Sequence, residues 1–89
     1  MAKTYPLRIL THEELVFEGK VESLMVPGAL GYLGVLSHHA PLITTLNSGQ
    51  LSFKDADEKT HRYSIKGGVL EVSNNQAVLL TESIQPLQP

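Results

Sequence analysis

The chain has 89 residues, enough for one domain (residues 1–89) with a single thin core. Its 7 basic and 9 acidic side chains give a net charge of −2, which leaves no basic surplus for a nucleic-acid backbone, and the absence of cysteine excludes disulfides, thiolate metal sites and a cysteine nucleophile. No apolar run approaches the ~18 residues of a membrane-spanning helix, so we expect membrane association only through a partner.

The first half of the chain predicts short β-strands separated by turns. Tyr5, Leu7 and Ile9 occupy alternate positions, which is the period-two pattern of a half-buried strand. Gly19 is expected to turn the chain, and Pro41 favours an extended or turn conformation at the residue before it. The predicted strands cover residues 5–10, 15–17, 21–26, 32–36 and 43–46.

The second half continues the same pattern. Leu51 and Phe53 alternate with polar residues, residues 55–58 form a charged hairpin loop, and residues 73–76 form the turn of a last hairpin. The pair at 67–68 is expected to form a sharp bend or bulge, where two glycines let backbones approach closely. The predicted strands cover residues 50–54, 61–66, 69–72 and 77–81.

Apolar residues do not recur at helical spacing over three turns anywhere in the chain. Short strands with frequent turn signals instead predict an all-β sandwich or flattened barrel in a single domain.

The histidines and glycines give little support for a catalytic, metal or cofactor site. The four histidines lack the spacing of a zinc site, and we expect His39, which precedes Ala40-Pro41, to fix its turn through a ring hydrogen bond to backbone. Gly28, Gly31 and Gly34 lack the order and the following helix of a dinucleotide-binding loop. We therefore predict no catalytic residue, no metal and no cofactor.

Three large apolar side chains, Leu30, Tyr32 and Leu33, lie in this glycine-rich stretch. Exposed aromatic and aliphatic side chains on a loop often mark a protein contact. The alternative is that they fold back onto the edge of the sandwich, and the residues alone leave both possibilities open.

Several ordered motifs carry a resemblance to a known family. Residues 26–49 read VPGxxGxxGxLxxHAPLxTxLxxG, and further similar segments cover residues 7–11, 16–22, 67–72 and 78–80. Over essentially its whole length the chain resembles the epsilon subunit of F-type ATP synthase. The resemblance implies a ten-stranded β-sandwich that corresponds to the N-terminal domain of that subunit.

The resemblance also implies a function. The expected role is that of a non-catalytic subunit of the central stalk, which binds the gamma subunit, rests on the c-ring and helps to couple proton translocation to ATP synthesis. The expected location is the cytoplasmic face of a bacterial inner membrane, or the stromal face of a thylakoid membrane, as a peripheral part of the complex.

By the same resemblance, the contact with the c-ring falls on Ala29, Leu30, Tyr32 and His39. Many family members carry Glu where this chain has Tyr32, so the contact is expected to be hydrogen-bonded or apolar here rather than ionic. The family's Pro-Gly before the histidine is replaced by Ser37-His38, which changes the expected turn.

Most family members continue into a C-terminal helical hairpin that can inhibit ATP hydrolysis. Here Pro86 and Pro89 forbid a helix at the end of the chain. We therefore expect a subunit that couples without inhibiting by the hairpin route.

Two other classes of protein remain as alternatives. A stand-alone sandwich that binds carbohydrate or peptide would need an aromatic platform, which is disfavoured by an aromatic content of 6% without tryptophan. A small β-barrel enzyme would need titratable residues clustered in a cleft.

Overall fold

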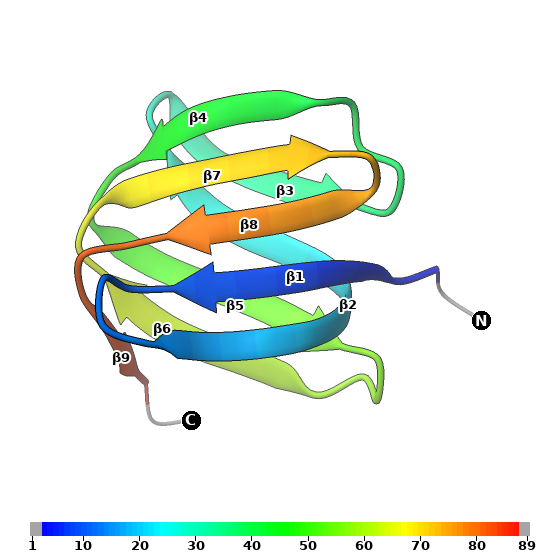
Figure 1. The fold of residues 1–89 in the computed structure, drawn as a ribbon, viewed down its shortest axis with the longest axis horizontal. Helices are drawn as coiled ribbons and strands as arrows, with labels where there is room; N and C mark the ends of the chain where they lie inside the picture. Colours follow the sequence, from blue (N-terminus) through cyan, green and yellow to red (C-terminus); the bar gives the residue numbers. More distant parts are fainter. Residues whose placement is uncertain (1–2, 88–89) are drawn as a thin grey trace.

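The computed structural model describes residues 3–87, which contain nine strands joined by turns and short connections (Figure 1). Within these residues there is no helix, so the all-β prediction is confirmed. The strands are β1 (Tyr5–Leu10), β2 (Leu15–Gly28), β3 (Gly31–Leu36), β4 (Leu42–Leu46), β5 (Gly49–Asp55), β6 (Thr60–Ile65), β7 (Gly68–Ser73), β8 (Gln76–Leu80) and β9 (Ile84–Pro86).

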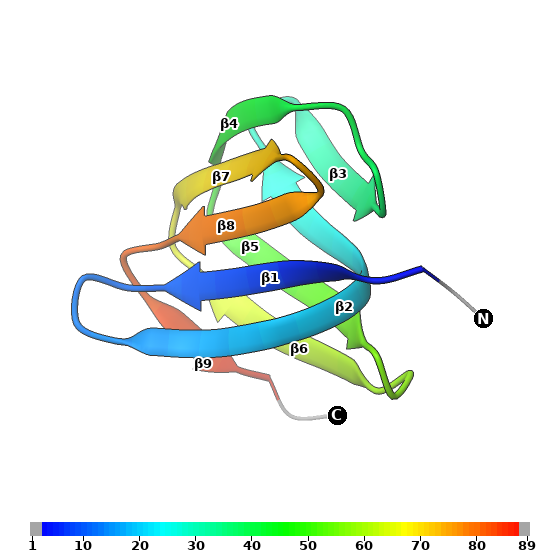
Figure 2. The ribbon, with the colours of Figure 1, turned by 45° about the vertical axis from the view of Figure 1, so that its right-hand side comes forward.

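The strands form one hydrogen-bonded sheet that is folded into two layers (Figures 1 and 2). One layer contains β4, β7, β8, β1 and the first half of β2, and the other contains β3, the second half of β2, β5, β6 and β9. β1 and β8 pair in parallel, whereas the other strand pairs are antiparallel.

Strand β2 corrects two expectations. The sequence predicted separate strands on either side of a turn at Gly19, but β2 is continuous for 14 residues. Gly19 does not turn the chain because it pairs with Leu7 in the ladder between β1 and β2. The register against β5 shifts between Val21 and Ser23, which is where β2 passes from one layer to the other. With β2 continuous, residues 3–87 contain nine strands instead of the ten that the resemblance implied.

Alternating side chains fill the space between the layers. Tyr5, Leu7 and Ile9 of β1 are buried, as are Leu51 and Phe53 of β5, so the period-two predictions for these strands are confirmed. The remaining buried apolar residues are Val21, Leu24, Val26, Val35, Leu46, Ile65, Leu70, Val72, Ala77 and Leu79.

Two turns follow the predicted chemistry closely. Asn74 and Asn75 both adopt positive φ, at 50° and 56°, and connect β7 to β8 as a two-residue hairpin turn. At Gly68, φ is 145°, and a Cβ there would collide with the carbonyl oxygen of Leu80. The backbones therefore approach closely at the predicted glycine bend because Gly68 has no side chain.

Candidate functional site

The connection between β2 and β3 is a tight hairpin whose tip carries Leu30. Gly28 pairs with Gly31 across the tip, and a Cβ on Gly28 would lie only 2.9 Å from the Gly31 carbonyl oxygen. Gly31 has a φ of 131°, which a residue with a side chain rarely adopts. Ala29 and Leu30 occupy the turn, and the Leu30 side chain is fully exposed. The glycines thus allow a sharp turn that presents a large apolar side chain to solvent.

The other apolar residues of this hairpin behave differently. Tyr32 is 61% exposed, but its hydroxyl accepts a hydrogen bond of 3.2 Å from the backbone N–H of Gln50. This bond holds the ring beside the start of β5, where Gly49 has no side chain to displace it. Leu33 is half-buried and packs against the core. The sequence left open whether these three side chains are exposed or fold back onto the sandwich. The structure shows that Leu30 and Tyr32 are exposed and that Leu33 packs against the sandwich.

His39 lies in the turn between β3 and β4. Its Nδ1–H donates to the Ala40 carbonyl at 2.7 Å, and its backbone N–H donates to the Leu36 carbonyl at 3.1 Å. The predicted ring hydrogen bond to backbone is therefore confirmed. The preceding residue, His38, has a φ of 64°, and its backbone N–H donates to Oδ1 of Asn75 at 2.6 Å. The Asn75 side chain thereby ties this turn to the turn between β7 and β8.

The four residues expected to contact the c-ring do not form a single cluster. Ala29, Leu30 and Tyr32 lie together at the β2–β3 tip, whereas His39 follows the opposite end of β3. A strand of 6 residues separates the two places, which corresponds to roughly 17–20 Å. In Figure 1 the β2–β3 tip lies at the upper left, and the connection between β3 and β4 lies at the right-hand side.

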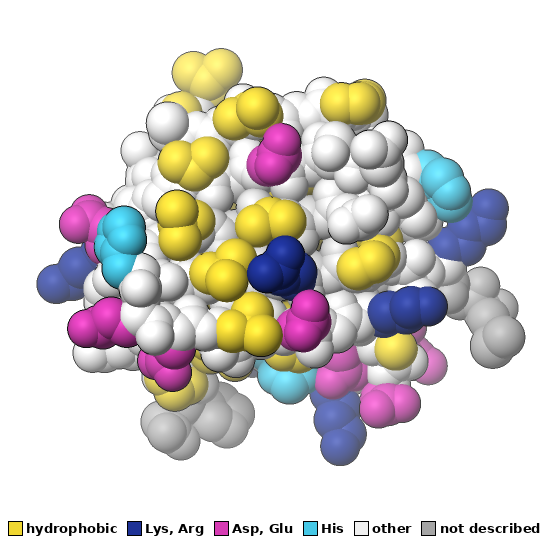
Figure 3. Space-filling model, in the orientation of Figure 1, with side chains coloured by type: hydrophobic (Ala, Val, Ile, Leu, Met, Phe, Trp, Pro, Cys, Tyr) yellow, Lys and Arg dark blue, Asp and Glu magenta, His cyan; other side chains and the backbone are white. Residues whose placement is uncertain are grey.

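A set of apolar residues, three of them exposed and one half-buried, lies on the face formed by β4, β7, β8, β1 and the first half of β2, and the sequence did not predict this set. Figure 3 shows hydrophobic side chains gathered over this face, with a few charged groups among them. Cross-strand pairing aligns Val69 with Leu80, Leu80 with Leu10, and Leu10 with Leu15. We call these four residues the apolar row.

The apolar row is bordered by polar and further apolar groups. In the neighbouring line across the sheet, Ile43 pairs with Glu71 and Arg8 pairs with Glu18, with 3.7 Å between Arg8 Nε and a Glu18 carboxylate oxygen. This face therefore combines a line of apolar side chains with a neighbouring line that contains charged groups, a mixture that occurs at protein–protein interfaces. Strand β8 contained a sequence signal for this surface, because the run from Ala77 to Leu80 is apolar at every position and does not alternate.

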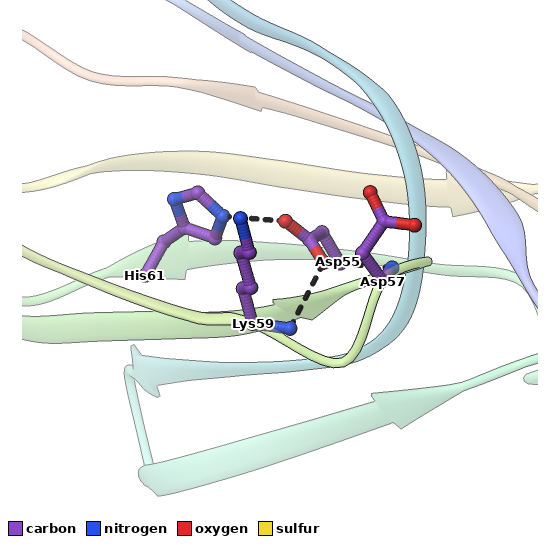
Figure 4. A network of polar contacts seen from close by, with 4 residues as sticks. All are labelled: Asp55, Asp57, Lys59 and His61. Atoms are coloured by element: carbon purple, nitrogen blue, oxygen red, sulfur yellow. Dashed lines mark hydrogen bonds and ion pairs between the residues drawn. The ribbon is translucent and has the colours of Figure 1, made fainter.

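The most connected polar group among the described residues is Asp55, at the turn between β5 and β6 (Figure 4). Its carboxylate accepts hydrogen bonds from the backbone N–H groups of Asp57 and Lys59, at 2.8 and 3.0 Å, and from Nε2 of His61 at 2.8 Å. The hydrogen bond from His61, followed by that from Lys59, lowers the pKa of Asp55 below its usual value of 3.8. The His61 ring stacks on Phe53 with 4.7 Å between ring centroids. The hydrogen bonds of the Asp55 carboxylate thus explain its presence, because they stabilise the turn between β5 and β6.

Residues 3–87 bring together no group of three His, Asp or Glu side chains that could hold a metal ion. Within the same residues, no helix is long and apolar enough to cross a membrane.

Comparison with known proteins identifies the family. A family model described as "ATP synthase, Delta/Epsilon chain, beta-sandwich domain" matches residues 4–87. The chain is 43% identical over 84 residues to the ATP synthase epsilon chain of Protochlamydia amoebophila, a match that covers 94% of this chain and 57% of that protein. It is 40% identical over 82 residues to the ATP synthase epsilon chain of Chlorobaculum tepidum, covering 92% of this chain and 93% of that protein. The chain belongs to the family of ATP synthase delta/epsilon β-sandwich domains, and the suspected resemblance is confirmed.

Solved structures support the same fold. A chain in the cryo-EM structure of the Euglena gracilis mitochondrial ATP synthase, "OSCP/F1/c-ring in rotational state 1", superposes with a TM-score of 0.88 at 22% identity. The match covers 93% of this chain and 53% of that one. A chain in the Tetrahymena thermophila mitochondrial ATP synthase "central stalk/cring" structure gives a TM-score of 0.77 at 12% identity. At these identities the similarity concerns the fold alone.

Proposed function

We propose that this chain is a non-catalytic subunit of the central stalk of an F-type ATP synthase, where it binds the gamma subunit and the c-ring and helps to couple proton translocation to ATP synthesis. It would associate with the membrane only through the complex, on the cytoplasmic face of a bacterial inner membrane or the stromal face of a thylakoid membrane. Membership of the epsilon-chain family supports this role.

The observation that carries the gamma-binding part is the apolar row on the face of β7, β8, β1 and β2. Leu80 lies in the middle of this row and is 41% exposed. Burying such side chains against a partner removes apolar surface from water at about 25 cal/mol per Å². The gamma subunit is the proposed partner for this face.

The proposed contact with the c-ring is formed by Ala29, Leu30 and Tyr32 at the β2–β3 tip, together with His39 at the other end of β3. One ring loop would not reach both places. A ring presents several copies of the same loop side by side, so different copies would contact the two ends of β3. The Tyr32 hydroxyl accepts the Gln50 N–H and keeps its own O–H to donate, so Tyr32 would contribute its ring as an apolar contact and its O–H as a hydrogen-bond donor.

The first experiment is a calorimetric titration of the folded chain with purified gamma subunit. We expect a 1:1 complex with a binding free energy of about −8 to −12 kcal/mol. Leu80→Lys places a charge in the apolar row and should weaken binding by at least about tenfold, which corresponds to about 1.4 kcal/mol. Ser64→Lys is the matched control, because Ser64 is exposed on the other layer of the sandwich.

Loss of binding in Leu80→Lys, with Ser64→Lys unaffected, would support the assignment of this face. A wild-type chain that is folded but does not bind gamma would contradict the proposal. It would then favour the alternative of a stand-alone binding module.

A further inference from the structure

The turn that leads to His39 is built from residues that do not favour its conformation. The His39 N–H donates to the Leu36 carbonyl, so residues 36–39 form a hydrogen-bonded β-turn. His38 occupies the third position of this turn with a φ of 64°, and a positive φ at that position is characteristic of a type II turn. Such turns favour proline at the second position and glycine at the third, whereas this chain has Ser37 and His38. The turn therefore gains little support from the conformational preferences of its own residues.

Asn75 supports the turn from another part of the chain. In a type II turn, the hydrogen bond between the first and fourth residues leaves the N–H of the third residue without a partner inside the turn. Here that N–H belongs to His38, and it donates to Asn75 Oδ1 at 2.6 Å. The Ser37 hydroxyl lies 3.5 Å from the same oxygen. A single amide oxygen thus contacts both central residues of the turn.

The β7–β8 turn is a rigid anchor for the Asn75 side chain. β7 and β8 are interior strands of their layer, with β4 on one side and β1 on the other. Both strands place apolar side chains in the core, namely Leu70, Val72, Ala77 and Leu79. Figure 1 shows the β7–β8 turn and the connection between β3 and β4 close together at the right-hand side. The core therefore fixes the position of Asn75 independently of the turn that it contacts.

The conformation of the turn determines where the imidazole of His39 lies. His39 follows His38 directly and closes the turn through its own N–H. Its Nδ1–H donates to the Ala40 carbonyl at 2.7 Å, and in this tautomer Nε2 is a hydrogen-bond acceptor. A different φ at His38 would rotate the backbone that follows, and the His39 ring would move with it. The direction in which Nε2 faces thus depends on the φ that Asn75 helps His38 to keep.

We propose that Asn75 is a positioning residue for the contact with the c-ring, because its Oδ1 holds the β3–β4 turn in the conformation that directs His39 toward the ring. Asn75 does not touch the ring itself and acts through His38 and His39. The inference rests on the proposed function, in which His39 belongs to the surface assigned to the c-ring. The contact at Leu30 does not depend on Asn75, because the β2–β3 tip lies at the other end of β3.

Capture of the c-ring by the chain bound to gamma tests the proposal, with the melting temperature and the affinity for gamma measured in parallel. Asn75→Gly removes Oδ1 but keeps the positive φ that the β7–β8 turn requires. We expect capture of the ring to fall by about fivefold, while gamma binding and the melting temperature stay at wild-type values. Asn75→Asp keeps an acceptor oxygen and tolerates the same φ, so it should capture the ring as the wild type does.

Two further substitutions test whether Asn75 acts through this turn. His38→Gly lets the turn adopt its positive φ without support, so adding it to Asn75→Gly should restore capture of the ring. His39→Ala removes the side chain that is positioned, so Asn75→Gly should have no additional effect in that background. A purely structural role would instead lower capture equally with and without His39. Asn74→Gly, at the neighbouring turn position, is the matched control and should leave capture unchanged.

The outcomes separate this inference from the proposed function. Wild-type capture by Asn75→Gly, where His39→Ala captures less of the ring, would overturn the positioning role and leave the ring contact standing. An equal loss from Asn75→Gly with and without His39 would also overturn it. Wild-type capture by His39→Ala would show that His39 does not contact the ring, and would overturn the inference together with that part of the contact. Failure of the folded chain to bind gamma would contradict the proposed function, and the inference with it.

Discussion

The hydroxyl of Tyr5 donates a hydrogen bond of 2.7 Å to the backbone carbonyl of Val35, 30 residues further along the chain. Tyr5 belongs to β1 in one layer and Val35 to β3 in the other, and both side chains are buried. Burial raises the pKa of Tyr5 above its usual range, so the hydroxyl stays protonated and donates. The bond crosses the core and positions edge strand β3 relative to the opposite layer.

Tyr5→Phe should destabilise the fold by about 1–2 kcal/mol, because it removes the donor and leaves a buried carbonyl with one hydrogen bond fewer. Urea unfolding measures this difference. Tyr63→Phe is the control, because Tyr63 is half-buried on β6. Removing its hydroxyl should change the free energy of unfolding by no more than about 0.5 kcal/mol. Equal effects of the two substitutions would show that the bond across the core contributes nothing specific.

Gly68→Ala should cost at least about 2 kcal/mol, because the positive φ is strained for alanine and the added methyl would collide with the Leu80 carbonyl oxygen. Thermal unfolding followed by circular dichroism gives the comparison. Gly34→Ala, also within a strand, should change stability by less than about 1 kcal/mol. A Gly68→Ala protein as stable as the wild type would show that the β7–β8 ladder can shift at this point.

Asn75 has two roles: its backbone adopts positive φ in the β7–β8 turn, and its side chain accepts a hydrogen bond from His38. The substitution Asn75→Gly separates them. Glycine tolerates the positive φ of the turn, so the hairpin should persist, but the variant lacks the Oδ1 atom that accepts the His38 N–H. We expect amide exchange at His38 to accelerate by about tenfold with little change in global stability. Asn74→Gly, at the neighbouring turn position, should leave exchange at His38 unchanged. Unaltered exchange in Asn75→Gly would mean that the turn between β3 and β4 is held by other contacts.

Asp55→Asn should make the stability of the fold vary less with pH in the acidic range. The pKa of Asp55 is lowered in the folded state, so its ionised form stabilises the fold above the ordinary carboxyl value of 3.8, and this contribution is lost as the pH falls through the lowered folded value. The melting temperature of the wild type should therefore fall more steeply below about pH 4 than that of the variant. Asp57→Asn removes a carboxylate from the same turn but not the hydrogen bonds to Asp55, and should retain the wild-type slope. A variant as acid-sensitive as the wild type would rule out Asp55 as a source of the slope.

Leu30→Ser tests the contact proposed at the β2–β3 tip. Leu30 is fully exposed, so its replacement should leave the melting temperature unchanged, whereas capture of the c-ring by the chain bound to gamma should fall by about tenfold. Leu87→Ser is the control, because Leu87 lies near the C-terminal strand, away from the tip. If Leu30→Ser captures the ring as well as the wild type does, the tip is not part of the contact.

Local patterns predicted much of the fold. The alternation at Tyr5, Leu7 and Ile9 reflects which side chains face the core, because successive residues of a strand point to opposite faces. The turn at Asn74 and Asn75 follows from the ability of asparagine to adopt positive φ. The glycine-rich hairpin around Leu30 was also recognisable as a place where a large apolar side chain could be presented to solvent.

Other features depended on neighbours distant in sequence. Gly19 does not turn the chain because Leu7 pairs with it, and a glycine accepts an extended conformation as readily as a turn. The distance between the β2–β3 tip and His39 follows from how β3 lies along β2. The apolar row exists only once β7, β8, β1 and β2 are aligned, because no two adjacent strands by themselves reveal it.

The sequence by itself therefore determined the all-β class, most strand positions, the family and the residues of the tip, since each rests on local periodicity, turn chemistry or an ordered motif. The tertiary structure alone decided the path of β2, the composition of the apolar row and the contact between Asn75 and His38. The physical reason is that strand pairing joins residues that are far apart in the chain. Whether a side chain or a backbone edge is covered depends on which strand lies beside it.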